Sequence, residues 1–350
     1  MEKLNVSSSP HITGNRTTRG IMLDVVIALI PAMIAATLLY GFYSLFIIGI
    51  SVGSCVLAEF LFNKIRKQEQ TIYDCSAVVT GVILALNLPP TVPFYVPIFG
   101  GFFAIMLVKM LFGGIGKNFA NPAITARIFL LLAWTGTMTT FVKPIDFSNG
   151  FGAMFENFKY TFGAFNSDLE TSLKAVTGAT PMAGIHEGNL EGINVLDMFL
   201  GRIGGSMGET SALALLIGGI YLIIKKVIDW KIPTIYLGTV AILTLCFKQD
   251  IAYLLPSLFG GGLMLGAFFM ATDYATSPNT KVGVCIYAFG LGLFTTLFRI
   301  FGSMPEGVSY AILLMNILVP LIDKCVRPKA FGYVKPVKEK KAKADKKEGK

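Results

Sequence analysis

The residues best suited to chemistry in this sequence are hydroxyl, amide and carboxylate side chains in four short polar stretches. The first stretch is Thr177-Gly178-Ala179-Thr180, which is followed by Pro181 and Met182. A hydroxyl in such a segment can be esterified, although small residues before a proline also simply form a tight turn. Because the stretch lies in a long hydrophilic segment, a site of covalent modification is one interpretation and a plain turn is the other.

The second stretch precedes an apolar segment and contains Ser206, Gly208, Glu209 and Thr210. Free backbone N–H groups at the start of a helix can hold a phosphate group. The sequence therefore predicts a contact with a cofactor phosphate here, and an ordinary glycine-serine turn is the alternative.

The third and fourth stretches offer hydrogen-bonding groups at the ends of apolar segments. Asn118 and Asn121 can both donate and accept hydrogen bonds, and Pro122 suits a first helical turn, so an N-cap is the alternative to a ligand contact. Asp273 follows Met270-Ala-Thr and could bind a ligand, cap a helix or pair with a basic side chain.

The remaining chemistry-bearing residues exclude several classes of site. The two histidines, His11 and His186, form no recognisable catalytic constellation, and no Walker or Rossmann motif has a suitable context. The five cysteines include no CxxC pair, which argues against an iron–sulfur cluster held by this chain alone. We therefore predict no catalytic side chain, no metal site, no NAD site and no nucleic-acid partner.

The elements that position these stretches are apolar. The chain is 53% hydrophobic and only 15% charged, whereas soluble domains carry about 25% charged residues. We therefore predict an all-α integral membrane protein with about ten transmembrane helices, since about 20 apolar residues cross the hydrocarbon core. The predicted spans are 21–41, 42–62, 75–90, 93–112, 121–140, 210–226, 232–248, 251–272, 282–301 and 307–323.

Basic residues in short loops predict the orientation. They cluster on the side that holds the N-terminus, which we take as cytoplasmic, and on the C-terminal tail. An odd number of helices in each half makes two inverted five-helix repeats the expected architecture. The predicted organisation is a cytoplasmic segment 1–20, a membrane half 21–140, an extracytoplasmic loop 141–209, a second membrane half 210–323 and a basic cytoplasmic tail 324–350 that attracts anionic lipid.

Charged residues are scarce inside these spans. Arg127 is predicted to lie deepest, whereas Asp24, Glu59, Lys109 and Arg299 lie near predicted helix ends, where long side chains can reach toward water. No ladder of carboxylates suggests a proton relay. The chain alone is therefore not expected to form a complete ion pump.

The polar stretches together resemble a known family. Thr177-Gly-Ala-Thr180 resembles the Ser/Thr-Gly-Ala-Thr flavin-attachment motif of the Rnf D subunit and of the B subunit of the sodium-pumping NADH:quinone reductase. Further matches cover most of the membrane portion in the expected order, and the ending Thr180-Pro-Met favours the Rnf protein over the quinone-reductase protein. They are Asp74-Cys-Ser-Ala-Val-Val-Thr-Gly81, Gly116-Lys-Asn118 with Asn121-Pro-Ala123, Gly204-Gly-Ser206 with Gly208-Glu-Thr-Ser211, and Met270-Ala-Thr-Asp273 with Thr276-Ser-Pro278. Two positions depart from the family pattern, because Lys174 replaces an Asp and Tyr274 replaces a Pro.

The resemblance implies a membrane electron-transfer subunit of a ferredoxin:NAD+ oxidoreductase complex that moves Na+ or H+ across a bacterial inner membrane. It implies covalent FMN on Thr180, attached as a phosphoester by a flavin transferase. It also implies a non-covalent riboflavin nearer the cytoplasmic side, close to Asn118 and Asn121, and partner subunits that carry flavins and iron–sulfur clusters.

Two rival interpretations stay open. An inverted-repeat solute permease would have a solute site at broken helices. A cofactor-free scaffold for other redox subunits would carry neither flavin nor solute.

Overall fold

The described part of the chain is built from helices. The computed structural model describes residues 16–145, 155, 181–188, 194–209, 211–302 and 307–326, and within them no strand element occurs. In the first half and the loop the helices are α1 (Thr18–Tyr40), α2 (Phe42–Ile65), η1 (Ile72–Asp74), α3 (Ser76–Leu86), α4 (Tyr95–Phe102), η2 (Phe103–Met110), α5 (Pro122–Ala133), α6 (Thr135–Met138), α8 (Pro181–Glu187) and α9 (Val195–Leu200). In the second half they are α10 (Ala212–Ile224), α11 (Lys231–Lys248), η5 (Ile251–Tyr253), α12 (Leu254–Phe259), α13 (Leu263–Leu265), η6 (Gly266–Met270), α14 (Lys281–Phe301) and α15 (Val308–Cys325).

The long apolar helices have the length that a membrane crossing needs. Within the described residues, α1, α2, α11, α14 and α15 are each long and apolar enough to cross, and η5–α12 with α13–η6 could add a sixth, bent crossing. The remaining apolar helices are shorter, namely α3, α4–η2, α5 and α10. The prediction of a helical membrane protein thus agrees with the structure, while the count of ten full-length spans is not established by helix length.

Helix α3 is shorter than the predicted span 75–90. Its 11 residues rise about 16 Å at 1.5 Å per residue, roughly half of the hydrocarbon core. Asn87 ends the helix, its side-chain amide donates to the carbonyl of Ile83 at 2.6 Å, and Pro89 follows. This span, which is short in sequence and could be broken or tilted, is a half-length helix followed by a turn.

The predicted span 251–272 is broken in the middle. Its two parts, η5–α12 and α13–η6, meet at an angle of 62°. Gly261 and Gly262 have φ angles of +65° and +66°, which favour glycine and allow the chain to change direction. The break leaves backbone carbonyls without helical partners, and they need donors from elsewhere.

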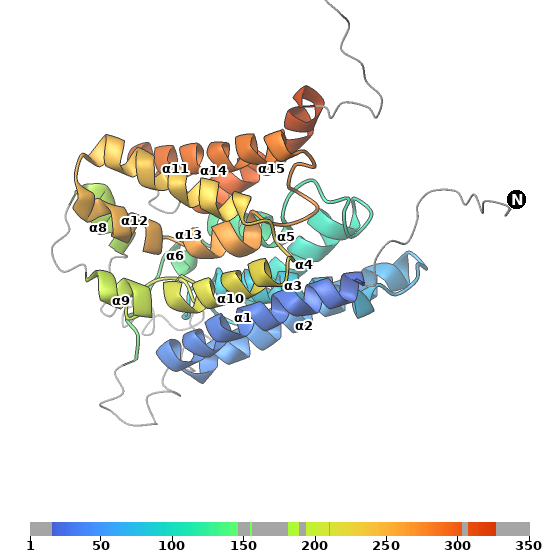
Figure 1. Ribbon diagram of the computed structural model, residues 1–350. Coiled ribbons are helices and arrows are strands. Elements are labelled where there is room, and N and C mark those ends of the chain that lie inside the picture. The colour runs from blue at the N-terminus through green and yellow to red at the C-terminus, as the bar shows by residue number, and fades with distance from the viewer. Residues whose placement is uncertain are drawn as a thin grey trace, which may run out of the picture.

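The two halves pack against each other along their first and last helices. Helix α1 packs on α10, and α5 packs on α15. In Figure 1, α1 and α2 run along one side of the molecule and α11, α14 and α15 along the opposite side, while α8, α9 and α12 gather at one end. Arg16 donates to the carbonyls of Lys225 and Lys226, so the start of α1 and the end of α10 lie at the same end of the bundle.

Candidate functional site

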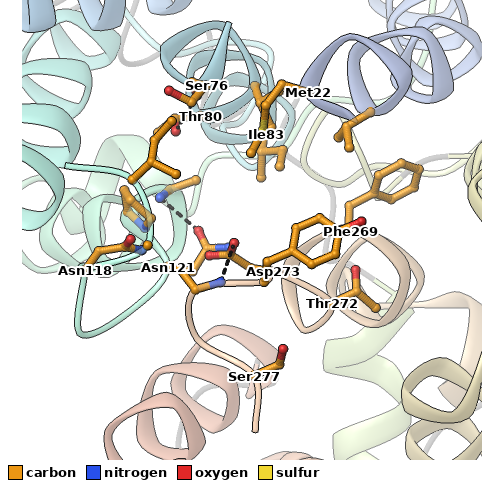
Figure 2. A pocket seen from close by; sticks show the side chains of 18 of the residues that line it. Met22, Ser76, Thr80, Ile83, Asn118, Asn121, Phe269, Thr272, Asp273 and Ser277 are labelled. Atoms are coloured by element: carbon orange, nitrogen blue, oxygen red, sulfur yellow. Dashed lines mark hydrogen bonds between the residues drawn. The ribbon is translucent and has the colours of Figure 1, made fainter. Parts of the chain in front are cut away.

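A cavity of about 510 Å³ lies between the two halves. Small-molecule sites typically measure about 300–1,000 Å³ and combine apolar walls with a few polar groups. Its apolar wall includes Met22 of α1, Ile83 of α3 and Phe269 of η6 (Figure 2). Its polar lining side chains are Ser76, Thr80, Lys109, Asn118, Asn121, Thr272, Asp273, Ser277, Asn279 and Asp323.

The structure brings Asn118, Asn121 and Asp273 together at this cavity, although the last is about 150 residues away in sequence. Asn121 is also the N-cap of α5, because its side-chain oxygen accepts from the N–H of Ala123 at 3.0 Å. Its amide nitrogen donates to the carbonyl of Met270 at 3.3 Å. The cap and the ligand-site interpretations are therefore compatible at this residue.

Asp273 lies in the loop after η6, where its carboxylate is bound by its own loop. The N–H of Ala275 and the hydroxyl of Thr276 donate to it at 3.3 and 3.4 Å. Burial raises the pKa of the Asp273 carboxyl above its usual value, and the two hydrogen bonds offset part of that rise. The neighbouring Tyr274, which replaces the family's proline, donates to the carbonyl of Val227 and ties this loop to the end of α10.

Lys109 and Glu59 form a buried ion pair beside the cavity. The ammonium of Lys109 lies 2.7 Å from the carboxylate of Glu59 and 2.6 Å from the hydroxyl of Ser76. The two charged side chains are 4% and 0% exposed. The expectation that these side chains would reach toward water was wrong, because each finds its partner inside the bundle on another helix.

Arg127 is buried, as predicted, and joins the first half to the segment that precedes α10. Its guanidinium lies 3.3 Å from the carboxylate of Glu209, and it donates to Asn87 at 3.2 Å and to Ser309 at 2.8 Å. These partners come from the end of α3, the loop before α10 and α15, whereas Arg127 itself belongs to α5. The network therefore ties the two halves together near the C-terminal end of α3.

Three backbone N–H groups in the stretch around Ser206 already have acceptors within the chain. The N–H groups of Met207 and Gly208 donate to the carbonyls of Leu88 and Leu86 at 3.0 and 2.6 Å, and that of Glu209 donates to Ser206. These three N–H groups are therefore not free for a phosphate, and two of them bind the loop to the end of α3. The Ser206 hydroxyl is buried and has no partner among the described atoms. Contacts of Ser206, Gly208 and Glu209 with a cofactor stay a prediction.

Arg299 of α14 satisfies the carbonyls that the broken helix leaves free. It donates to Ser257 at 2.6 Å, to Gly260 at 2.8 Å and to Gly261 at 3.2 Å. Its own carbonyl lies 2.8 Å from the Nδ1 atom of His186, which belongs to α8. Arg299 is 6% exposed, so the expectation of a side chain reaching toward water was wrong here as well.

The predicted attachment motif lies outside the described residues. The predicted site residues that lie outside the described part of the chain are Thr177, Gly178, Ala179, Thr180 and Thr210. Helix α8 begins at Pro181, directly after Thr180, and it packs on α12 at the helix break. Within the described residues no group of three or more His, Cys, Asp or Glu side chains could hold a metal ion.

Comparison with known proteins identifies the family. The model of the NQR2, RnfD, RnfE family matches residues 5–332. The chain belongs to this family. It is 46% identical to the D subunit of the Na(+)-translocating ferredoxin:NAD(+) oxidoreductase complex of Acetobacterium woodii, over 97% of this chain and 98% of the relative. It is 38% identical to the D subunit of the proton-translocating ferredoxin:NAD(+) oxidoreductase complex of Clostridium ljungdahlii (93% and 96% covered). It is 35% identical to the D subunit of the ion-translocating oxidoreductase complex of Mannheimia succiniciproducens (94% and 98% covered).

Sequence reasoning missed part of the cavity of this family member. Ser76 and Thr80 belong to the stretch 74–81 that matched the family, but nothing in one sequence showed that they face the same space as Asn121. Lys109 was visible as a charge within an apolar span, which is a signal of function. Because Lys109 lies near a predicted helix end, we instead expected its side chain to reach toward water.

Proposed function

We propose that this chain is the D-type membrane subunit of an ion-translocating ferredoxin:NAD+ oxidoreductase complex of the Rnf kind. The observation that carries the proposal is its 46% identity, nearly end to end, with the D subunit of such a complex. The NAD and iron–sulfur chemistry then belongs to partner subunits. This chain contributes an electron path through the membrane.

The cavity fits a non-covalent flavin such as riboflavin. Its volume is in the range of ligand sites, and its walls are apolar apart from a few convergent polar groups. Asn118, Asn121 and Asp273 can hydrogen-bond a polar ring edge, while Phe268 and Phe269 can cover a planar ring. A bound flavin would supply one- or two-electron transfer, and the chain's part is to orient it and exclude water.

We place covalent FMN on Thr180, in agreement with the motif Thr177-Gly-Ala-Thr180. The support is local, since α8 starts at the next residue and Met182 and His186 contact the helix break and Arg299. A cofactor on Thr180 would therefore be tethered to a helix that is docked on the second half. A separate flavin transferase would install it.

We further propose ten membrane segments in two inverted halves, with both termini in the cytoplasm of a bacterial cell. Each half then has an interrupted third segment, α3 in one and α12–α13 in the other. Packing of α1 on α10 and of α5 on α15 is what a two-fold relation between the halves would produce. In this orientation the cavity lies toward the cytoplasm and Thr180 toward the outside.

The test is whether flavin fluorescence stays with the chain after denaturation. The chain is expressed with its flavin transferase, separated on a denaturing gel and viewed under ultraviolet light. We expect a fluorescent wild-type band, no fluorescence in Thr180→Val, and retained fluorescence in the control Thr177→Ser, which keeps the family motif. A dark wild-type band with an active transferase would exclude covalent FMN. A colourless purified complex with solute flux would favour a permease instead.

A further inference from the structure

Lys109 brings a buried positive charge to the wall of the cavity. Its residue lines the cavity, whereas its partner Glu59 does not. The pair is therefore oriented, with its cationic end at the cavity and its anionic end in the protein behind it. The other charged residues that line the cavity, Asp273 and Asp323, are acidic.

The protein holds this ion pair in place from behind. One carboxylate oxygen of Glu59 binds Lys109, and the other accepts from the hydroxyl of Thr71 at 2.5 Å. Thr71 in turn accepts from the side-chain amide of Asn63 at 3.0 Å. Because both Glu59 oxygens are occupied, the carboxylate is fixed and so is the ammonium that it pairs with.

An ammonium has three N–H donors, and the described contacts of Lys109 use two of them, to Glu59 and to Ser76. The third donor remains for a ligand in the cavity. A charge in a site with little water acts more strongly than one at the surface. A group that becomes negative at this wall would therefore be stabilised.

We propose that Lys109 compensates the negative charge that a flavin in this cavity gains on reduction, and so raises its reduction potential. The inference rests on the proposed non-covalent flavin. The electron comes from a reduced flavin or iron–sulfur cluster of a partner subunit, which is oxidised, and it stays on the ring. Lys109 loses no proton and forms no bond. Glu59 is a positioning residue that holds the ammonium and moderates its charge.

The proposal predicts opposite effects of the two partners. In the purified complex, the non-covalent flavin is released with acid and quantified by chromatography, and its potential is measured by a spectroscopic redox titration. We expect Lys109→Gln with Glu59→Gln to lower the reduction equilibrium constant at least tenfold, which is about 59 mV for one electron. Glu59→Gln alone is expected to raise the potential. The control Asp229→Asn with Lys231→Gln removes an exposed ion pair and should leave the reduction potential of the flavin unchanged.

The outcomes separate this inference from the proposed function. A wild-type complex without non-covalent flavin overturns this inference and the proposed flavin in the cavity, but not the assignment as a D-type subunit. A double variant that keeps its flavin at an unchanged potential overturns only the role of Lys109. If the double variant loses flavin while Lys109→Arg keeps it, the positive charge is needed and the proposal is supported. Loss from both variants in a folded complex overturns charge compensation in favour of packing.

Discussion

The guanidinium of Arg127 and the carboxylate of Glu209 lie 3.3 Å apart in the interior, where their side chains are 7% and 5% exposed. The pair joins α5 of the first half to the loop that leads into α10, the first helix of the second half. Without the carboxylate, the Arg127 guanidinium would keep its hydrogen bonds to Asn87 and Ser309 but would lose the opposite charge that offsets its burial. The contact therefore joins the two halves by a buried ion pair.

Glu209→Gln should destabilise the protein by about 3–5 kcal/mol, because it leaves the Arg127 charge uncompensated. Thermal unfolding of the detergent-solubilised protein measures the effect. Asp229→Asn, which breaks the exposed pair with Lys231, serves as the control and should cost about 1 kcal/mol or less. Equal effects of the two substitutions would contradict a structural role for the buried pair.

Gly218 of α10 allows the close approach of α1. A Cβ atom at this position would overlap with the carbonyl oxygen of Ala28. Gly218→Ala should therefore push the helices apart and lower the unfolding temperature. The matched control is Gly238→Ala in α11, where a Cβ would meet nothing within 4 Å and alanine should gain up to about 1 kcal/mol in helix propensity. A Gly218→Ala protein as stable as the control variant would refute this close packing.

The sequence predicted the elements of the fold better than their interruptions. Apolar runs placed helices close to where they occur, because burial from water dictates which segments become membrane helices. The shortening of α3 depends on Asn87 and the proline residues after it, and the break at Gly261 depends on Arg299, which lies in another helix. A hydropathy window averages over such local features and cannot detect them.

Contacts between residues far apart in the sequence could not be predicted either. Asn121 could be predicted as a cap from its neighbours Pro122 and Ala123, since a cap is a local feature. The pairing of Lys109 with Glu59 joins residues 50 positions apart, and nothing in one sequence specifies it. Both were therefore predicted to reach toward water, although the structure buries them together.

Asp273 should make stability depend on pH. Its pKa is raised in the folded state, so the folded form binds a proton more tightly than the unfolded form. The contribution of the Asp273 carboxyl to the free energy of unfolding is therefore present in acid, and it is lost as the pH rises through the raised pKa. The unfolding temperature of the wild type minus that of Asp273→Asn should fall as the pH rises from about 4. A difference that is flat or rising with pH would contradict this prediction, and Thr272→Val, a neutral change in the same loop, should show no such trend.

Arg299 should be required for the broken helix between α12 and α13. Arg299→Gln cannot reach and satisfy the carbonyls of Ser257, Gly260 and Gly261 together, and each lost hydrogen bond from a charged donor costs about 1.5–3 kcal/mol. We expect a marked loss of thermal stability. We also expect faster proteolysis within η5–α12, because water would then bind the freed carbonyls. Arg299→Lys should recover only part of the stability, because an ammonium lacks the planar fork that binds several carbonyls at once. Arg66→Gln, at the exposed end of α2, is the control for the loss of an arginine. If Arg299→Gln unfolds at the same temperature as this control, the break must be held by the glycines and by the contact of Met182 alone.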